Sequence, residues 1–306
     1  MELCTELSQL KDKYANICIA LGTFDGVHRG HQQVIGAAVE RAREIDGTSL
    51  VFTFSNHPLS VVAPERCPVR LMSNDEKQTV MQSLGVDVLV NIPFTKEILE
   101  IGAEDFIRML IEAYAPKFVV VGPNYTFGHK NQGNSELLKE FGKKYGFEVK
   151  IHEAVCDTDD LISSTLIRGY INDGNVEKTA DLLGRDFRLT STVVHGDERG
   201  RTIGFPTANL DLPPEAAVPN NGVYAVRAIT ADGVVHSAVA NIGTNPTFDG
   251  IYRHIEVHIL DFAADIYGQE LTIEFLAKLR NEQKFSGIEA LVNQLHQDVE
   301  TAKKYF

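Results

Sequence analysis

The 306-residue sequence predicts an α/β protein with two domains: a parallel sheet wrapped by helices over residues 1–184, and an antiparallel β-barrel with a terminal helix over residues 185–306. Three observations lead to this prediction. The chain is long for a single hydrophobic core. Its first part alternates short apolar runs with amphipathic helical stretches, as parallel sheets do. Beyond residue 184 the apolar runs follow one another closely with short turns, which is typical of a barrel.

Short apolar runs in the first domain predict buried strands at residues 17–21, 50–54, 86–90, 118–121 and 147–151. Helical periodicity predicts helices at residues 31–45, 104–114, 136–145 and 175–183. A further helix follows Ser73 and Asn74, either of which can cap it. In a sheet of this kind, ligands bind at the carboxyl ends of the strands.

Apolar runs in the second domain predict strands at residues 187–194, 222–229, 234–242, 254–262 and 271–275. Ala231-Asp232-Gly233 supplies a turn between two of them, because glycine tolerates a positive φ. Ser286 can cap a final helix. That helix carries an apolar stripe that we expect to pack on the barrel, made of Ile288, Leu291, Val292, Leu295, Val299 and Ala302.

The composition excludes several classes of function. The formal net charge is −13, so most of the surface repels a polyanion and nucleic acid is not expected as a partner. The 4 cysteines are scattered without a CxxC pair, which argues against a disulfide framework and a cysteine zinc site. No apolar run approaches the roughly 20 residues that span a membrane, and the polar N-terminus does not resemble a signal peptide. We therefore expect a cytoplasmic protein, and the oligomeric state is left open.

A glycine-rich loop, Gly22-Thr23-Phe24-Asp25-Gly26-Val27-His28-Arg29-Gly30-His31, joins the first predicted strand to the first helix. Its glycines let the backbone turn tightly and let a ligand approach closely. A helix that begins near His31 points free N–H groups at an anion. His28 lies three residues earlier, so both imidazoles can donate hydrogen bonds to a pyrophosphate leaving group.

Other interpretations of this loop fit less well. A glycine-rich turn alone is a weak indication of function. A metal site at the two histidines has no third ligand at useful spacing. The loop is not a Walker A motif, because no Gly-Lys-Ser/Thr follows it. Nucleotidyl transfer remains, by direct attack on an α-phosphate without a covalent intermediate.

His28-Arg29-Gly30-His31 is similar to the HxGH signature of the nucleotidyltransferase superfamily. The longer phrase GTFDGVHRGH resembles the prokaryotic bifunctional riboflavin kinase/FMN adenylyltransferase family, also called FAD synthetase. Three further segments carry the same resemblance: TFSNHP at residues 53–58, VGPNYTFG at residues 121–128 and ISSTLIR at residues 162–168.

The resemblance implies a Rossmann-like nucleotidyltransferase domain in which His28, His31 and Arg168 are catalytic. It places these residues at the ATP phosphates: Gly22, Phe24, Asp25, Gly30, Ser163, Ser164 and Thr165. The sequence has no Trp, so stacking on the flavin falls to Phe or Tyr, with Phe127 and Phe54 as the candidates, and Asn124 is a further expected flavin contact. From the residues alone, a hydroxyl near Ser164 is equally a plain N-cap, whereas Arg168 offers a fixed fork for oxyanions. Leu166 departs from the family pattern, because many members carry a second Arg there.

A second glycine-rich segment covers residues 195–209, HGDERGRTIGFPTAN. Three glycines and two arginines after a strand suit a phosphate clamp, although a solvated hairpin loop has a similar composition. The phrase resembles the riboflavin kinase domain, whose mark is Pro-Thr-Ala-Asn. The resemblance implies that Thr207 and Asn209 hold Mg²⁺ and the ATP phosphates. It also implies nucleotide contacts from His195, Gly196, Arg199, Gly200, Arg201 and Gly204.

Glu256 lies in an alternating apolar strand between Ile255 and Val257. Periodicity alone favours an outward surface carboxylate over an inward catalytic base. The resemblance reverses this preference, because the family kinase uses a Glu here to accept the proton of the ribityl 5′-hydroxyl. Arg280 matches a family Arg near the flavin.

The sequence therefore predicts an enzyme that phosphorylates riboflavin to FMN and then adenylylates FMN to FAD, with ATP as co-substrate of both steps. Two alternatives stay open: a protein with only one working half, and a flavin or nucleotide sensor without activity. A sensor has no need of a base at Glu256.

Overall fold

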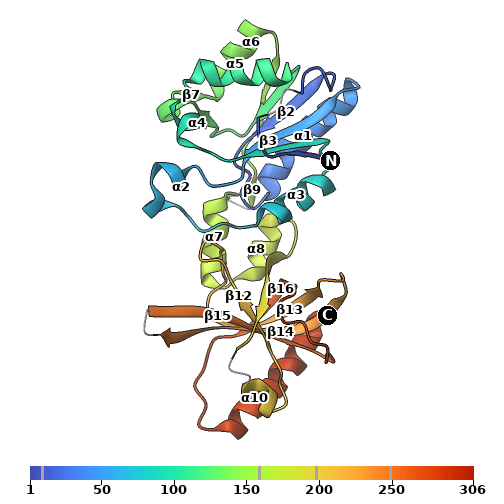
Figure 1. Ribbon diagram of the computed structural model, residues 1–306, viewed down its shortest axis with the longest axis vertical. Coiled ribbons are helices and arrows are strands. Elements are labelled where there is room, and N and C mark those ends of the chain that lie inside the picture. The colour runs from blue at the N-terminus through green and yellow to red at the C-terminus, as the bar shows by residue number, and fades with distance from the viewer. Residues whose placement is uncertain (8–9, 158–159, 197–198, 248–249) are drawn as a thin grey trace. The chain divides into compact units, whose positions relative to one another are not determined.

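The computed structural model describes residues 1–7, 10–157, 160–196, 199–247 and 250–306. The chain divides into two compact units, Met1–Ser164 and Thr165–Phe306 (Figure 1). Among the described residues, no helix has the length and apolar character needed to cross a membrane.

A six-stranded parallel sheet forms the centre of the N-terminal unit. Its strands, in spatial order, are β1 (Glu2–Cys4), β4 (Val88–Ile92), β3 (Thr48–Phe54), β2 (Ile17–Leu21), β5 (Phe118–Val121) and β8 (Glu148–Ile151). The predicted parallel sheet is thus confirmed. Because a parallel sheet is covered on both faces, its central strands are buried along their length rather than at alternate residues.

Helices cover both faces of this sheet (Figure 1). Ile17, Ile19 and Leu21 of β2 share a core with α5 (Ala103–Tyr114) and α6 (Ser135–Tyr145). Cys18 and Ala20 share a second core with α1 (Arg29–Glu44) and α3 (Asn74–Ser83). Shorter elements complete the unit: α2 (Leu59–Val62), η1 (Pro64–Arg66), α4 (Lys96–Glu100), β6 (Thr126–Phe127), η2 (His129–Asn131), β7 (Gly133–Asn134), β9 (Cys156–Asp157) and β10 (Asp160–Leu161).

The starts of two helices differ from or refine the sequence prediction, because polar side chains cap them. Helix α1 begins at Arg29 rather than near His31, because the His28 side chain caps it. Ser73, not Asn74, caps α3, and its Oγ accepts a hydrogen bond from the Glu76 N–H at 3.1 Å. Strand β1 was not predicted because it is three residues long.

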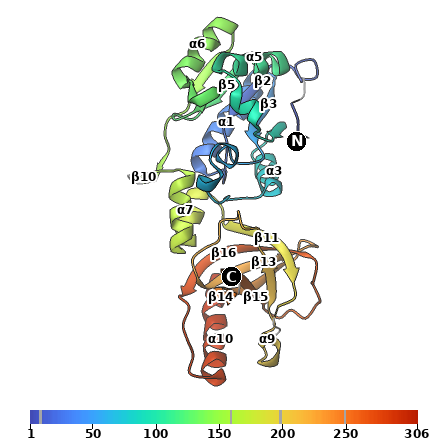
Figure 2. The ribbon, with the colours of Figure 1, turned by 60° about the vertical axis from the view of Figure 1, so that its left-hand side comes forward.

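The C-terminal unit contains a closed antiparallel barrel (Figure 2). Its strands, in spatial order, are β11 (Phe187–Val194), β12 (Ala208–Asp211), β15 (Gly250–Ile259), β14 (Val235–Thr247), β13 (Gly222–Thr230) and β16 (Glu270–Arg280). The predicted barrel is confirmed, with β12 as a strand that the sequence did not predict. Helices α7 (Ser164–Asp173) and α8 (Val176–Leu183) precede the barrel, and α8 packs against β16 and β11.

The terminal helix α10 (Ile288–Ala302) packs on the barrel, as expected (Figure 2). Ala302 is fully buried and shares an apolar cluster with Val223 and Val239. Two expectations about this helix are wrong. Gly287 holds the N-cap position without a side-chain bond, so Ser286 is not the cap. Ile288, at the start of the helix, is 68% exposed, whereas Leu291, Val292, Leu295 and Val299 of the same stripe are half-buried.

Asp87 joins three elements of the N-terminal unit. Its carboxylate accepts bonds from Arg43 Nη1 and Nη2 at 2.8 and 3.0 Å, and from the N–H and Oγ of Ser49 at 2.9 and 2.7 Å. Burial raises the pKa of Asp87, but these bonds outweigh burial and lower the pKa to about 2. The bonds therefore stabilise the fold above pH ~4, and that contribution is lost as the pH falls through about 2.

We predict that Asp87→Ala lowers the free energy of unfolding of the N-terminal unit by about 2 kcal/mol at pH 7, because Ser49 and Arg43 lose their acceptor. Hydrogen exchange of the β3 and β4 amides measures the loss, which should shrink as the pH falls from about 4 to about 2. Glu136→Ala, which removes an exposed ion pair with Lys139, is the control and should change little. Equal protection in Asp87→Ala and the wild type would contradict the prediction.

Candidate active sites

The loop after β2 brings His28 and His31 together at the start of α1. The rings stack with centroids 3.6 Å apart and planes 20° from parallel. His28 is the N-cap residue, and its Nδ1 accepts a hydrogen bond from the His31 N–H at 3.3 Å. An accepting Nδ1 leaves Nε2 of a neutral His28 as the proton carrier. His28 is thereby a hydrogen-bond donor at a helix N-terminus, where anions bind.

His31 is held in its neutral form. Burial lowers its pKa well below the usual value, and the nearby His28 and Lys77 act in the same direction. Its Nδ1 is buried and has no hydrogen-bond partner within the described part of the chain. A neutral imidazole beside a stacked partner offers an N–H to a phosphate oxygen without carrying a charge of its own.

The backbone of this loop is strained. Phe24 has φ 47° and Val27 has φ 39°, a region that L-residues seldom adopt and β-branched residues least of all. The Phe24 ring lies over Gly22, where an added Cβ would come within 2.8 Å of it. The same ring makes an edge contact with His31, with centroids 5.3 Å apart. Gly22 and Phe24 thus shape the loop around the histidines.

Side chains from three other segments fix the loop. The carbonyl of Thr23 accepts bonds from Thr53 Oγ1 at 2.9 Å and from Lys77 Nζ at 3.2 Å. The Asp25 carboxylate accepts from the Leu71 N–H at 3.1 Å. Ser164 Oγ donates to the Asp25 carbonyl at 2.9 Å. Asp25 and Ser164, both predicted at the ATP phosphates, therefore form part of the framework of the loop.

The remaining predicted residues of adenylyl transfer lie in different surroundings. Gly30 packs beside the His28 ring, where an added Cβ would come within 3.2 Å of it. Asn124 is exposed, Phe54 is half-buried against Phe94, and Phe127 is 6% exposed within the apolar core. Ser163 is half-buried before α7, while Thr165 and Arg168 belong to the C-terminal unit. The ATP and flavin contacts of these residues stay predictions.

In the C-terminal unit, the loop between β11 and β12 packs closely on the Pro-Thr-Ala-Asn segment. A Cβ at position 196 would collide with the Asn209 amide. A Cβ at position 200 would collide with the Phe205 carbonyl and would lie 3.6 Å from Thr207 Oγ1. Glycine at both positions lets the loop reach Asn209 and Thr207, so the structure brings these predicted residues together. Gly204 has a positive φ of 85°, and the side chain of Arg199 lies outside the described residues.

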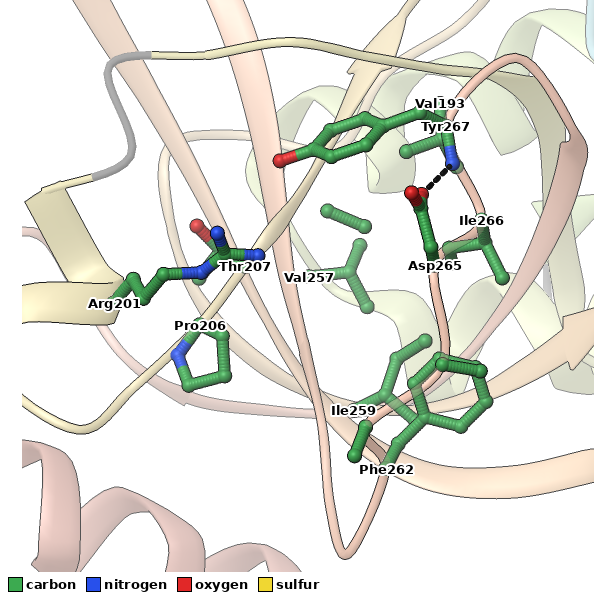
Figure 3. A pocket seen from close by; sticks show the side chains of 13 residues that line it. Val193, Arg201, Pro206, Thr207, Val257, Ile259, Phe262, Asp265, Ile266 and Tyr267 are labelled. Atoms are coloured by element: carbon green, nitrogen blue, oxygen red, sulfur yellow. Dashed lines mark hydrogen bonds between the residues drawn. The ribbon is translucent and has the colours of Figure 1, made fainter.

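A pocket of about 340 Å³ opens beside Thr207 (Figure 3). Arg201, Pro206 and Thr207 line one side, and the loop after β15 supplies the other. Tyr267 from that loop stacks on His195 with centroids 3.8 Å apart. Most of the lining is apolar: Val193, Ala208, Val257, Ile259, Phe262, Ala263, Ala264 and Ile266. An apolar pocket with a few polar groups at its edge suits an aromatic ring with a charged tail.

Glu256 lies on the outer face of the barrel. Its neighbours Ile255 and Val257 are fully buried, whereas the Glu256 side chain is 39% exposed. The expectation of an inward carboxylate is therefore wrong in orientation, because the alternation of β15 turns position 256 outward. Asn209 of β12 pairs directly with Glu256 in register, so the two side chains share a face. His254 Nε2 lies 3.9 Å from Glu256 Oε1.

Arg280 is tied to the terminal helix. Its Nε and Nη2 donate to the buried Asp298 carboxylate at 2.9 and 2.7 Å. Gln294 Nε2 donates to the same carboxylate at 2.9 Å. A paired arginine of this kind positions α10 on the barrel, and the flavin contact of Arg280 stays a prediction.

The side chains near Thr207 can supply only some of the ligands of a metal ion. Within the described residues, no group of three His, Cys, Asp or Glu side chains could hold a metal. Thr207 and Asn209 instead offer one hydroxyl and one amide oxygen. These are hard ligands of the kind that Mg²⁺ accepts when nucleotide phosphates and water complete its shell. The residues fit Mg²⁺ bound together with a nucleotide.

Sequence reasoning missed Lys77 and Tyr267. Lys77 lies on a mostly polar helix, where a lysine is expected to be exposed, but it is 4% exposed. Tyr267 lies in a loop without a strand pattern. Gly268, which follows Tyr267, was the available signal, because glycine marks turns and loops between strands.

Comparison with known proteins links each unit to a family. A family model described as FAD synthetase matches residues 10–166. A second, described as riboflavin kinase, matches residues 183–306. A crystal structure named as a macrolide-efflux protein from Streptococcus pneumoniae has a TM-score of 0.90 and 33% identity, with 100% of both chains covered.

Curated relatives match along the full length. The bifunctional riboflavin kinase/FMN adenylyltransferase of Escherichia coli strain K12 is 36% identical over 308 residues, covering 100% of this chain and 98% of the relative. The protein of the same name from Listeria monocytogenes is 39% identical, covering 95% and 93%. With both family models matched in chain order, the chain belongs to the bifunctional riboflavin kinase/FMN adenylyltransferase family.

Proposed function

We propose that the chain makes FAD from riboflavin in two ATP-dependent steps at two separate sites. The C-terminal site transfers the γ-phosphoryl group of ATP to riboflavin and releases ADP. The N-terminal site transfers the adenylyl group of a second ATP to FMN and releases pyrophosphate. We assign adenylyl transfer to residues 1–184 and phosphorylation to residues 185–306. The observation that carries the proposal is the presence of two unrelated glycine-rich loops in one chain, each beside its own polar side chains.

Adenylyl transfer needs donors for the charge that grows on pyrophosphate. We assign this role to His28 and His31, whose stacked rings lie at the N-terminus of α1. The attacking group is a phosphate oxygen of FMN, which is already ionised near neutral pH, so the step requires no general base. Arg168 and the Ser163–Thr165 segment are proposed to bind the ATP phosphates.

Phosphorylation needs a base, because the riboflavin hydroxyl must lose a proton. We assign Glu256, which lies beside Asn209 on the barrel surface, to accept it. The apolar pocket next to Thr207 is proposed to hold the ATP base, and the glycine-rich loop over Asn209 its phosphates. Thr207 and Asn209 would hold Mg²⁺, which supplies charge neutralisation at the transferred phosphoryl group when it is bound.

The partners proposed for the chain are riboflavin, FMN and ATP, and the proposed location is the cytoplasm. Efflux, the word in the name of the Streptococcus pneumoniae structure, is not proposed for this chain. Both matched family models name enzymes that act on flavins.

One assay tests the proposal. Purified protein is incubated with ATP, Mg²⁺ and either riboflavin or FMN, and the flavins are separated chromatographically. FAD from both starting flavins is expected. FMN alone from riboflavin leaves only the kinase, and FAD from FMN alone leaves only the adenylyltransferase. Absence of any turnover rejects both activities and favours a sensor.

Glu256→Gln should abolish FMN formation, with a loss of at least about 100-fold in kcat, because an amide cannot accept the hydroxyl proton. FAD formation from supplied FMN should stay within twofold of the wild type, since that reaction is assigned to a separate set of residues that does not include Glu256. Glu270→Gln removes an exposed carboxylate of β16 and is the matched control for the barrel. Unchanged FMN formation in Glu256→Gln would exclude this residue as the base.

His28→Ala should give the opposite pattern. FAD formation from FMN should fall by about 100-fold, because a donor to the leaving group and the α1 cap are lost together. FMN formation from riboflavin in the same preparation reports that the C-terminal unit is folded, and hydrogen exchange of the β3 and β4 amides reports the same for the N-terminal unit. His28→Asn separates the two roles, since asparagine still caps a helix. Full activity in His28→Asn would show that capping alone is required.

A further inference from the structure

Lys77 is a buried lysine that has no role in the chemistry assigned above to the two sites. It lies in the first turns of α3 and is 4% exposed. Its Nζ donates to the carbonyls of Thr23 at 3.2 Å and Phe54 at 3.1 Å. An ammonium group is rarely buried, because losing its water costs free energy that the fold must offset.

The two acceptors of Lys77 belong to neighbouring strands. Phe54 ends β3, and Thr23 lies two residues beyond the end of β2. Strands β2 and β3 pair in parallel, so both carbonyls lie at the carboxyl edge of the sheet. A single ammonium group therefore joins this edge, the glycine-rich loop and α3.

The loop requires such a link. Thr23 immediately precedes Phe24, which has φ 47°, and Val27 at φ 39° follows three residues later. Strained conformations persist only where the surrounding structure determines them fully. Thr53 Oγ1 donates to the same Thr23 carbonyl, so a neutral and a charged donor hold one acceptor from two sides. The charged bond is the stronger of the two types.

The charged and titratable groups around Lys77 come from three segments. Asp25 of the loop favours its charged form, whereas Arg70, before α3, opposes it. His31 of α1 is the third, and the Lys77 charge lowers its pKa. Burial is the largest influence on Lys77 itself and lowers its pKa to about 8. The ammonium form is therefore present at neutral pH and is lost under mildly alkaline conditions.

We propose that Lys77 is a positioning residue for adenylyl transfer, whose ammonium group fixes Thr23 and thereby the strained loop that presents His28 and His31 to the leaving group. The inference rests on the proposed adenylyl transfer at this loop. Lys77 acts through the loop backbone, so it affects the rate of the chemical step more than the binding of FMN. A lysine that only fills the core would affect stability and leave the rate of the folded enzyme unchanged.

Three full-length variants test the proposal. Lys77→Met keeps the length of the side chain but removes both donated bonds and the charge, and Lys77→Arg keeps a cation with donors. Lys139→Met, at an exposed lysine of α6, is the matched control. Each is assayed for FAD formation from supplied FMN, and hydrogen exchange of the β3 and β4 amides reports that the N-terminal unit is folded.

In Lys77→Met, kcat for FAD formation should fall by about 100-fold while the KM for FMN stays within about threefold, since small displacements of catalytic groups have effects of this size. The control should equal the wild type, and Lys77→Arg should recover part of the loss. A kcat in Lys77→Met within threefold of the wild type would overturn the proposal. Failure of the wild type to make FAD from FMN would instead reject the proposed function.

The pH profile gives a second, independent measurement that does not require the Met variant to fold. The wild-type kcat/KM for ATP should fall above pH about 8, where the free enzyme loses the Lys77 proton. This alkaline limb should move to higher pH in Lys77→Arg, because a guanidinium stays charged. A wild-type profile that is flat up to pH ~10, or a limb that Lys77→Arg leaves in place, would contradict the role of Lys77.

Discussion

The proposed adenylyl site depends on one constraint: the chain leaving β2 must turn within seven residues and start α1 with its first N–H groups exposed at the end of the loop. The loop meets this constraint with left-handed backbone at Phe24 and Val27, where L-residues are disfavoured. Hydrogen bonds to the Thr23 carbonyl and the Asp25 carboxylate hold it in that form. The positions of His28 and His31 follow from the backbone, because one histidine caps the helix and the other stacks on it.

In the barrel, the proposed phosphate-binding loop between β11 and β12 is held by different contacts. Here the loop lies against a strand, and glycines at positions 196 and 200 allow it to approach the side chains of Asn209 and Thr207. Pairing of β12 with β15 then places Asn209 beside Glu256. Backbone strain sets the geometry of the first site, whereas strand register and close packing set that of the second. A one-residue slip of β12 would move Asn209 to the opposite face of the barrel and separate it from Glu256.

Much of the architecture could be predicted from the sequence, because apolar runs and their spacing record which faces are buried. Strands β1 and β12 could not, since each is short and its pairing depends on distant partners. The alternation of β15 predicted the outward orientation of Glu256, whereas the family resemblance favoured an inward one. The burial of Lys77 had no local signal either, because its acceptors lie 54 and 23 residues away along the chain. Contacts of this kind depend on tertiary structure.

The substrates proposed for the chain are anionic, whereas its net charge is −13, and the geometry of the proposed sites accounts for this combination. Around the first loop, the proposed donors are the uncharged imidazole of His31, the His28 side chain and the start of a helix, and the buried cation Lys77 bonds to carbonyls. Uncharged donors hold phosphate through short-range geometry rather than through a long-range field. They therefore favour an anion that is correctly placed over one that is merely nearby. The negative charge on the leaving pyrophosphate increases during the reaction, so the hydrogen bonds to it become stronger. These hydrogen bonds therefore stabilise the transition state more than they stabilise the bound ATP.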